Sequence, residues 1–366
     1  MASSNEGGIA AAAAEQLGSM ALGKSGERKE DIEAKNTEPT TKNGTPTKLC
    51  SACGKKSKAA NALKKCNGCK CVWYCDKKCQ NKHRKVHKHE CKVIMKELDK
   101  RGGKLDVGTE LDLGPLEKLP PREECPICMR ALPIHTMLQT QSNCCGKTVC
   151  GGCDFQHQRK SRELAVPLTC EFCREPVPES DEEVSDEAIL AQIRKRAELK
   201  DPDALNNLAV YYGDGDYGLS VDQAKCIDLL RESADHGFPD AQYNLGKYYH
   251  FSEMGLEQND EEALKYYKKA ADGGHVLARH NLGCVEERKG DLIAAMRHFR
   301  LSASGGFKPS MTNLIIYFEN GDLHHADLAE TTQTFYRSRA EMKSEDRDKY
   351  IAYLKKVGEY EAKYEW

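Results

Sequence analysis

The phrase Ala204-Leu-Asn-Asn-Leu208 recurs three more times in the second half of this chain of 366 residues. The further copies are Ala241-Gln-Tyr-Asn-Leu-Gly246, Ala278-Arg-His-Asn-Leu-Gly283 and, in weaker form, Ser310-Met-Thr-Asn-Leu314, at steps of 37, 37 and 32 residues. A second phrase keeps the same spacing and reads Ser233-Ala-Asp-His-Gly237, Ala270-Ala-Asp-Gly-Gly274 and Ser302-Ala-Ser-Gly-Gly306. Each repeat then contains two helices, ended by glycine or a polar turn. Repetition at this period predicts an α-solenoid.

The repeated phrases resemble the Sel-one-like repeats, relatives of tetratricopeptide repeats. In that family a Gly-containing turn precedes an Asp-led second helix that ends in Ala-Ala-x-x-Gly. Here Gly218 and Gly255 match the turn, and Asp222 and Asn259 match the start of the second helix. The resemblance implies a protein-binding scaffold over residues 188–340, with three good units and a degenerate fourth.

Residues 341–366 carry an apolar stripe at helical spacing, which predicts a helix that caps the solenoid. The stripe consists of Tyr350, Tyr353, Leu354, Val357, Tyr360 and Tyr364. The expected fold class is therefore mainly α, with an α-solenoid of helix-turn-helix repeats in the second half of the chain.

Zinc modules are indicated by the cysteines, because 16 of the 18 lie between Cys50 and Cys173. The first set is Cys50-x2-Cys53, Cys66-x2-Cys69, Cys75-x3-Cys79 and His87-x3-Cys91. The second set is Cys125-x2-Cys128, Cys144-Cys145, Cys150-x2-Cys153 and Cys170-x2-Cys173. A structural zinc ion takes four ligands, and a Cys-x2-Cys turn presents two thiolates to one ion. Eight ligands per set predict four zinc ions, two for each set of ligands.

Disulfides are the alternative use of so many cysteines, and they suit small secreted proteins. The Ala-rich stretch Ile9 to Ala14 lacks a basic leader and is flanked by Glu6 and Glu15, which is unlike a secretory signal. No run of about 18 apolar residues is present to span a membrane. We therefore expect reduced thiols that hold metal, in the cytoplasm or the nucleus.

The first set resembles the MYND finger over residues 50–91, through Tyr74-Cys75-x3-Cys79-Gln80 and His87-Lys88-x2-Cys91. That family interleaves its pairs, which implies one zinc on Cys50, Cys53, Cys75 and Cys79 and another on Cys66, Cys69, His87 and Cys91. Spacing alone also permits sequential pairing. We interpret Cys71 as a free thiol and His83 as a surface residue. The family usually has Trp between Gln80 and His87, where this chain offers Arg84.

The second set resembles an all-cysteine RING finger. Lys147 stands where a common RING has histidine, and an ammonium has no lone pair for a metal. The adjacent pair Cys144 and Cys145 matches variants in which Cys-Cys-Gly precedes Cys-x2-Cys. The resemblance implies one zinc on Cys125, Cys128, Cys150 and Cys153 and another on Cys144, Cys145, Cys170 and Cys173. Both resemblances thus imply two small cross-brace zinc modules ahead of the α-solenoid. His157 is a substitute ligand that the spacing leaves open.

A RING resemblance implies a ubiquitin ligase, which positions a ubiquitin-loaded conjugating enzyme and does no covalent chemistry of its own. Ile127 and Phe172 would supply the apolar contacts, and Arg174, after the last ligand, would supply the cation. Two features differ from the common RING pattern and weigh against ligase activity. Glu171 occupies the position where such fingers commonly have Pro, and no Trp lies between Cys153 and Cys170. The alternative is a non-catalytic zinc-finger scaffold. No paired carboxylates or phosphate loop indicate a small-molecule substrate.

The charged residues are distributed unevenly along the chain, although its formal net charge at pH 7 is only -2. Between Lys48 and Arg101 there are 17 basic and four acidic residues, a local +13 that leaves about -15 for the remainder. A basic finger makes association with nucleic acid a third hypothesis. The remaining boundaries predicted from composition are a disordered tail (1–47), a MYND-type finger (48–96), a linker (97–121), a RING-like finger (122–178) and an acidic linker (179–187).

Overall fold

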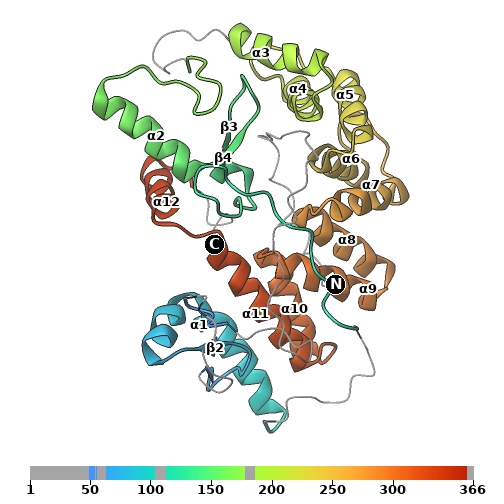
Figure 1. Cartoon of the computed structure of the whole chain (residues 1–366). Helices are drawn as coiled ribbons and strands as arrows, with labels where there is room; N and C mark the ends of the chain where they lie inside the picture. The colour runs from blue at the N-terminus through green and yellow to red at the C-terminus, as the bar shows by residue number, and fades with distance from the viewer. Residues whose placement is uncertain (1–48, 54, 56–62, 104–112, 178–185, 361–366) are drawn as a thin grey trace, which may run out of the picture.

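The computed structural model describes residues 49–53, 55, 63–103, 113–177 and 186–360. It confirms the mainly α-helical architecture, in which cysteine-rich modules precede a helical solenoid (Figure 1). The predicted disordered tail, residues 178–185 of the acidic segment and Tyr364 lie outside the described residues. In the part of the chain that is described, no helix combines the length and the apolar character that crossing a membrane requires.

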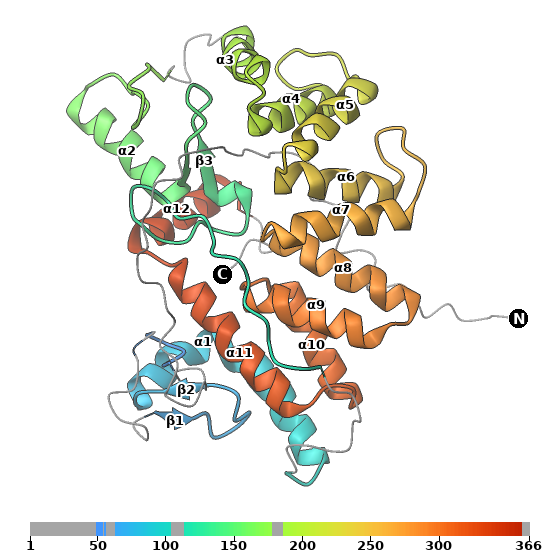
Figure 2. The ribbon, with the colours of Figure 1, turned by 45° about the vertical axis from the view of Figure 1, so that its right-hand side comes forward.

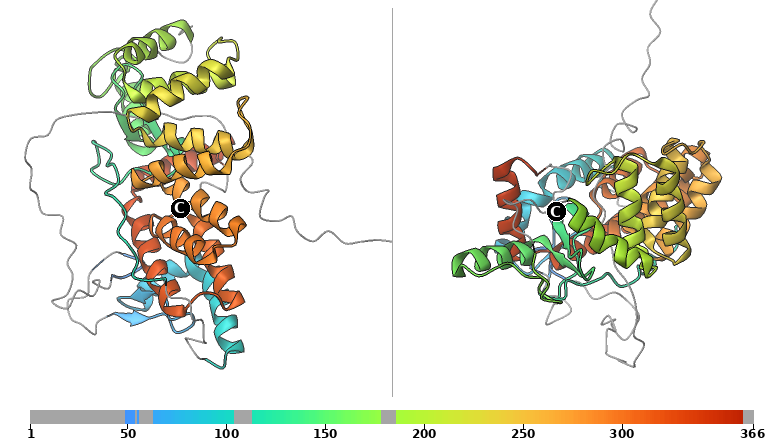
Figure 3. Two further views of the ribbon diagram at one scale, coloured as in Figure 1. Left: turned by 90° about the vertical axis from the view of Figure 1, so that its right-hand side faces the viewer. Right: turned by 90° about the horizontal axis from the view of Figure 1, so that it is seen from above.

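The solenoid stacks its helices in antiparallel pairs along the long axis of the molecule (Figure 3). Its helices are α3 (Asp186–Glu198), α4 (Pro202–Asp214), α5 (Gln223–Asp235), α6 (Pro239–Phe251), α7 (Asp260–Asp272), α8 (Val276–Lys289), α9 (Leu292–Ser304), α10 (Lys308–Asn320) and α11 (His325–Glu341). The four repeated phrases lie on α4, α6, α8 and α10, the first helix of each pair. The fourth pair is present although its sequence is degenerate.

The helix boundaries follow from capping residues. The side chains of Asp222 and Asn259 accept hydrogen bonds from the first-turn amides of α5 and α7, as N-caps do. The backbone of Gly218 and Gly255 is left-handed, with φ of 71° and 72°, in the turn before each second helix. These are the positions that the sequence predicts for the turn and for the helix start.

Small residues in the repeats allow adjacent helices to approach closely. A Cβ atom added to Gly246 of α6 would lie 2.6 Å from the ring of Tyr267 on α7. One added to Gly283 of α8 would lie 2.6 Å from the ring of Phe299 on α9. The glycines of the second and third repeated phrases are therefore explained by the aromatic rings that occupy the space of a side chain.

The first finger (residues 49–103) combines a two-residue antiparallel pair with one long helix. The pair consists of β1 (Lys64–Lys65) and β2 (Trp73–Tyr74), and the helix is α1 (Lys77–Lys100). Ile94 and Leu98 on α1 belong to the same buried cluster as Leu314 and Phe318 on α10. The first finger therefore packs on the last helix pair of the solenoid (Figure 2).

The second finger (residues 122–177) contains a hairpin and a helix. The hairpin pairs β3 (Gln139–Gln141), which follows a 3-10 turn at Thr136–Leu138, with β4 (Thr148–Cys150), and the helix is α2 (Gly151–Leu164). On β3, Gln141 donates from Nε2 to both carboxylate oxygens of Asp203 at 2.9 Å. Asn207 donates from Nδ2 to Gln141 Oε1 at 3.1 Å. The hairpin is thus bonded to α4, near the beginning of the solenoid.

The last helix, α12 (Glu345–Val357), differs from the expected solenoid cap, because it packs against α2 of the second finger. Ile351 and Leu354 are buried with Leu138 of this finger, whereas Tyr353 and Val357 of the predicted stripe are exposed. A Cβ atom on Gly152 would lie 2.6 Å from the backbone nitrogen of Arg347, so glycine permits this contact. The second finger therefore contacts both ends of the helical array (Figure 1).

Candidate metal centres

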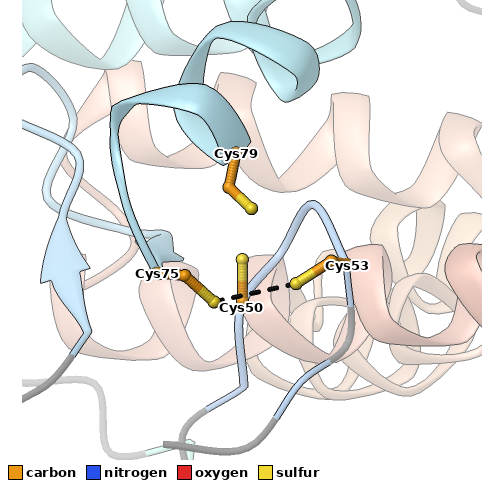
Figure 4. Close-up of side chains that lie close together, drawn as sticks. All are labelled: Cys50, Cys53, Cys75 and Cys79. Carbon is orange, nitrogen blue, oxygen red and sulfur yellow. Dashed lines mark hydrogen bonds between the residues drawn. The ribbon is translucent and has the colours of Figure 1, made fainter.

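Site 1 is formed by two segments of the first finger, a turn and the start of α1. Its ligand atoms, from Cys50, Cys53, Cys75 and Cys79, lie within 4.8 Å of one another. Figure 4 shows the four side chains pointing toward a common centre, with Cys53 and Cys75 Sγ atoms 3.7 Å apart. Asp76 caps α1 by accepting from the amide of Cys79 at 2.8 Å, and this cap fixes the fourth ligand on the first helical turn.

Site 2 combines the turn after β1 with the middle of α1, and its ligands are Cys66, Cys69, His87 and Cys91. His87 and Cys91 are four residues apart on the same face of α1. His87 Nε2 lies 3.2 Å from Cys69 Sγ, and its Nδ1 lies 3.2 Å from the hydroxyl of Tyr336 on α11. A partner at Nδ1 orients the ring so that Nε2 is the metal-facing nitrogen.

Sites 3 and 4 lie in the second finger. Site 3 gathers Cys125, Cys128, Cys150 and Cys153, and site 4 gathers Cys144, Cys145, Cys170 and Cys173. The pairs are interleaved along the chain, as in the first finger. The adjacent cysteines of site 4 occupy the tip between β3 and β4, so the hairpin turn itself supplies two ligands.

The sulfur separations fit zinc. Zinc–sulfur bonds of about 2.3 Å around a tetrahedral ion place two sulfurs about 3.8 Å apart. The contacts Cys66–Cys91, Cys128–Cys150 and Cys145–Cys170 measure 3.6, 3.9 and 3.6 Å. A disulfide requires about 2.05 Å, and all 18 cysteines are unpaired. Zinc supplies the cross-link in such sites, and the thiolate and imidazole donors present here suit it.

One backbone turn recurs in the ligand loops. The residue after the second cysteine has a left-handed backbone in three of them, with φ of 60° at Lys70, 53° at Met129 and 62° at Arg174. Its amide donates to the carbonyl of the first cysteine, at 3.2, 2.8 and 3.2 Å respectively. This turn directs both thiolates of a Cys-x2-Cys pair to one side, which explains why the spacing is an effective signal for a metal site.

Backbone amides also stabilise the thiolate of site 3. The amide of Cys150 donates to Cys125 Sγ at 3.4 Å. The side chain of Cys150 and the amides of Cys128, Cys150 and Ile127 lower the pKa of Cys125 against the opposing effect of burial, and the contact with Cys125 raises the pKa of Cys150. Because a metal binds the thiolate and not the thiol, the amide hydrogen bonds favour the ligand form of Cys125.

His83 is not the surface residue that the sequence suggested. Its side chain is buried between Tyr74, whose hydroxyl lies 2.9 Å from Nδ1, and the ring of Tyr336. Burial lowers the pKa of His83 to about 3, so the ring is neutral at pH 7. The earlier interpretation was wrong because α1 is covered on this face by α11, which is distant in the sequence.

Two further predicted residues lie outside the sites. Cys71 is buried, with its Sγ 3.2 Å from the carbonyl oxygen of Cys69 and 3.3 Å from His325 Nε2. His157 has Nε2 at 2.9 Å from the carbonyl oxygen of Thr169 and is not part of the fourth ligand group. The structure thus places neither side chain among the groups that could hold a metal.

Arg347 lies beside site 3, a placement that the sequence did not reveal. Its guanidinium comes from α12, is almost fully buried, and donates from Nη1 to Ala131 O at 2.8 Å and Met342 O at 2.6 Å. Its Nη2 lies 3.5 Å from Cys128 Sγ and from Arg130 O. Four thiolates around one Zn²⁺ carry a net charge of about -2, so a buried cation here is electrostatically favourable.

The three residues predicted to contact a partner are all on the surface. Ile127 is 45% exposed and Phe172 is 36% exposed, each between the two cysteines of a ligand pair. Arg174 is exposed immediately after the last ligand. Two apolar side chains are therefore presented to solvent by loops of different metal sites.

Comparison with known families identifies two modules. The MYND finger family matches residues 50–91, and the Sel1 repeat family matches residues 202–238 and 239–275. Among the matched structures are a Sel1 repeat protein from Oxalobacter formigenes and a protective antigen of uropathogenic Escherichia coli with an SLR fold. The first is 21% identical with a TM-score of 0.34, covering 47% of this chain and 64% of that chain. The second is 23% identical with a TM-score of 0.35, covering 57% and 42%.

The chain is also similar to two curated proteins over short lengths. Histone-lysine N-methyltransferase ASHR1 of Arabidopsis thaliana is 43% identical over 53 residues, 14% of this chain and 10% of that protein. A SET and MYND domain-containing protein of Dictyostelium discoideum is 41% identical over 49 residues, 13% of this chain and 9% of that protein. The chain thus spans about a tenth of the length of these relatives.

Proposed function

We propose that this chain, a zinc-binding protein-interaction protein with a MYND finger and Sel1 repeats, is a RING-type ubiquitin ligase whose repeats recruit the client. The observation that supports the proposal most is the exposure of Ile127 and Phe172 on two interleaved metal loops. An apolar side chain held in water on a rigid metal loop is a suitable anchor for a partner protein. The expected compartment is the cytoplasm or the nucleus, where thiols remain reduced.

Arg174 would act by positioning. A ligase of this kind accelerates transfer by holding the conjugating enzyme and the ubiquitin thioester in a reactive arrangement. The exposed guanidinium can donate in several directions at once, which suits a bridge between two proteins. Arg174 also keeps a left-handed backbone, φ 62°, which costs a non-glycine residue about 1 kcal/mol or more. The same backbone occurs at Lys70 and Met129, so it belongs to the ligand turn and the proposed role rests on the exposed guanidinium.

Replacing Arg174 is expected to abolish ubiquitin transfer while the zinc content stays unchanged. Arg174→Ala removes the bridging cation, and Arg174→Gly removes it in a residue that accepts positive φ without strain. Both variants should therefore lose autoubiquitination, measured with purified activating and conjugating enzymes and quantified on gels. Lys160→Ala, which removes an exposed cation on α2, is the matched control and should transfer normally. Transfer at the unaltered rate by Arg174→Gly would contradict the assigned role.

Ile127→Ala is expected to weaken capture of the conjugating enzyme by about 1 to 3 kcal/mol, the usual range for truncating an apolar anchor. The loss should appear as a higher dissociation constant in calorimetry with a conjugating enzyme that supports transfer. Met129→Ala is a control on the same loop, because this side chain is 69% exposed and lies outside the Cys125–Cys128 turn. Equal affinities for Ile127→Ala and the unaltered protein would remove Ile127 from the interface.

The second hypothesis for the function is a non-catalytic zinc-finger scaffold. Glu171 occupies the usual Pro position and buries an Oε1 atom that has no hydrogen-bond partner among the described residues. If the unaltered protein transfers no ubiquitin with a broad panel of conjugating enzymes, the ligase proposal fails and the scaffold remains. The methyltransferase activity named for the Arabidopsis relative belongs to that protein, whose matched part is a tenth of its length.

Association with nucleic acid is the third reading, and the surface of α1 favours it. Basic side chains follow one another along the exposed side of this helix. They are Lys78, Lys82, Lys85, Lys92 and Lys96. Affinity that depends on phosphate contacts falls steeply with salt. Binding of duplex DNA or RNA that is unchanged between 50 and 200 mM salt, or absent at both, would exclude this reading.

A further inference from the structure

An extended stretch of the inter-finger linker lies along the solenoid. This stretch, the linker segment Leu113–Arg122, contains no helix or strand. Figure 2 shows it passing in front of α9 on its way to the second finger. Its contacts with the solenoid are made by residues more than 150 positions later in the sequence. The linker segment is therefore bound to the solenoid surface along its length.

Two arginines of α9 donate hydrogen bonds to backbone carbonyl oxygens of the linker segment. Arg300 donates from Nη1 to the carbonyl oxygen of Gly114 at 3.0 Å, and Arg297 donates from Nε to the carbonyl oxygen of Leu113 at 3.3 Å. Arg300 is only 2% exposed. Its Nη2 is held at 2.9 Å by each of Asp327 and Glu330 on α11. A buried guanidinium oriented by two carboxylates is a preorganised donor for a peptide carbonyl.

Side chains anchor the same segment. Leu113 is buried in the cluster that contains Met296 and Phe299 of α9. Leu116 and Leu119 are half-buried, and the intervening side chains are exposed. Apolar positions at intervals of three, in a chain whose carbonyls are bonded, give an extended peptide both affinity and register.

The far end is fixed by a second set of contacts. Arg122 donates to the carbonyl oxygen of Gly305 and to the hydroxyl of Ser338. Pro120 lies beside Gly274, where an added Cβ would be 3.5 Å from Pro120 Cβ. The negative charge of Glu117 raises the pKa of Arg279 on α8 against the larger lowering effect of burial. The solenoid residues Gly274, Arg279, Arg297, Arg300 and Gly305 together form what we call the linker track.

We propose that the linker track is a binding site for an extended client peptide and that the linker segment is a self-ligand that occupies it. The proposal deepens the client recruitment suggested above, and it names the client's chemistry as an extended Leu-Gly-Pro segment followed by spaced leucines. Recognition combines two backbone carbonyls with spaced apolar side chains, so another segment with the same anchors can replace the self-ligand. Displacement would release the connection between the two fingers from the solenoid.

Gly114 defines the most selective position of such a client. Its φ is 68°, in the left-handed region, and an added Cβ would meet nothing within 4 Å. The requirement for glycine therefore comes from the backbone conformation and not from lack of space. A client must place a residue that accepts positive φ directly after its first leucine.

The tether makes the self-ligand a strong competitor. A covalently attached ligand acts at an effective concentration in the millimolar range. A free peptide with a dissociation constant near 100 μM would thus bind the unaltered chain about tenfold or more weakly than a chain whose linker segment is removed. This difference is the signature of a self-occupied site.

The test uses the full chain with residues 113–121 replaced by nine Gly and Ser residues, which keeps the fingers connected. The probe is a labelled synthetic peptide with the sequence of residues 113–121, titrated in fluorescence anisotropy. We expect saturable binding to the Gly-Ser chain and at least tenfold weaker binding to the unaltered chain. Absence of saturable binding to the Gly-Ser chain up to about 1 mM, or equal binding to both chains, would overturn the proposal.

Control variants of the protein and of the peptide distinguish binding at the linker track from non-specific binding. In the Gly-Ser chain, Arg297→Gln removes one carbonyl donor at an exposed position and should weaken binding about tenfold, whereas Lys268→Gln, an exposed cation on α7, should not change it. A peptide with Gly114→Ala should bind about fivefold or more weakly, and a scrambled peptide should not bind.

Circular dichroism and zinc content verify folding of each variant. If the Gly-Ser chain does not fold, Leu113→Ser in the full chain is measured instead, and it should bind the peptide more tightly than the unaltered chain. Failure to do so overturns the proposal. The titration contains no ubiquitin component, so loss of ligase activity and loss of peptide binding are separate results.

Discussion

Cys145→Ser is expected to lower the zinc content from four ions to three per chain and to unfold the part of the second finger around site 4. Cys145 supplies one of four ligands of site 4, with its Sγ 3.6 Å from that of Cys170. Structural zinc contributes about 10 to 16 kcal/mol in small fingers, and binding and folding are one event there. The neighbouring Asn143 accepts from Arg196 of α3 at 3.3 Å, so the first solenoid helix should also lose a contact.

The measurement is elemental analysis after extensive dialysis, followed by hydrogen exchange of the second finger and of α3. Cys284→Ser is the matched control, because this half-buried cysteine on α8 belongs to no ligand group, and it should retain four ions. Four ions in Cys145→Ser would show that another side chain completes site 4, and two or fewer in the unaltered protein would show that one finger does not bind metal as expected.

The second large effect concerns Arg347, whose replacement by methionine is expected to destabilise the chain by about 3 to 5 kcal/mol, the range for removing one partner of a buried charge pair. The loss has two sources. Site 3 would lose its buried counter-charge, and the carbonyls of Ala131 and Met342 would lose their donor. Met is close to Arg in length and keeps the apolar contacts, so the change isolates the guanidinium.

Urea denaturation followed by circular dichroism measures the free energy of unfolding, and a colorimetric chelator measures zinc release. Arg347→Met should release its most labile ion faster than the unaltered protein. Lys349→Met, on the exposed side of the same helix with surface ion pairs to Glu345 and Asp346, should change neither. If Arg347→Met unfolds at the same urea concentration, the guanidinium is not a structural partner of site 3.

Much of the fold could be predicted because its signals are local. A helix pair occupies about 37 residues, so the phrases ending at Leu208 and Leu245 reveal the solenoid by their spacing alone. A Cys-x2-Cys turn likewise fits within one short loop, as at Cys125 and Cys128. The structure gathers the 16 predicted ligands in four groups, and their occupation by zinc stays a prediction for metal analysis.

The contacts between modules could not be predicted in this way. Tyr336 contacts His87 across 249 positions, and Arg347 contacts Cys128 across 219. In the sequence Arg347 is one of several charged residues on a helix, a pattern that ordinarily indicates a solvated surface. Only the course of the whole chain brings it to site 3. The same limitation explains the error at His83, whose burial depends on α11.

The contact of α12 with the second finger also affects the order of events during synthesis. Translation at about 5 to 20 residues per second needs roughly 10 to 45 seconds to add the 219 residues between Cys128 and Arg347. Throughout that interval the cysteines of site 3 are already part of the chain while the cation beside them is not, and Gly151 and Gly152 lack the helix that covers them. The nascent chain therefore passes through a stage in which all cysteines of the second finger have been synthesised and α12, which packs against this finger, has not. A chain that ends shortly before Arg347 would keep all 16 ligands of the four sites, but it would lack the contact between α12 and the second finger.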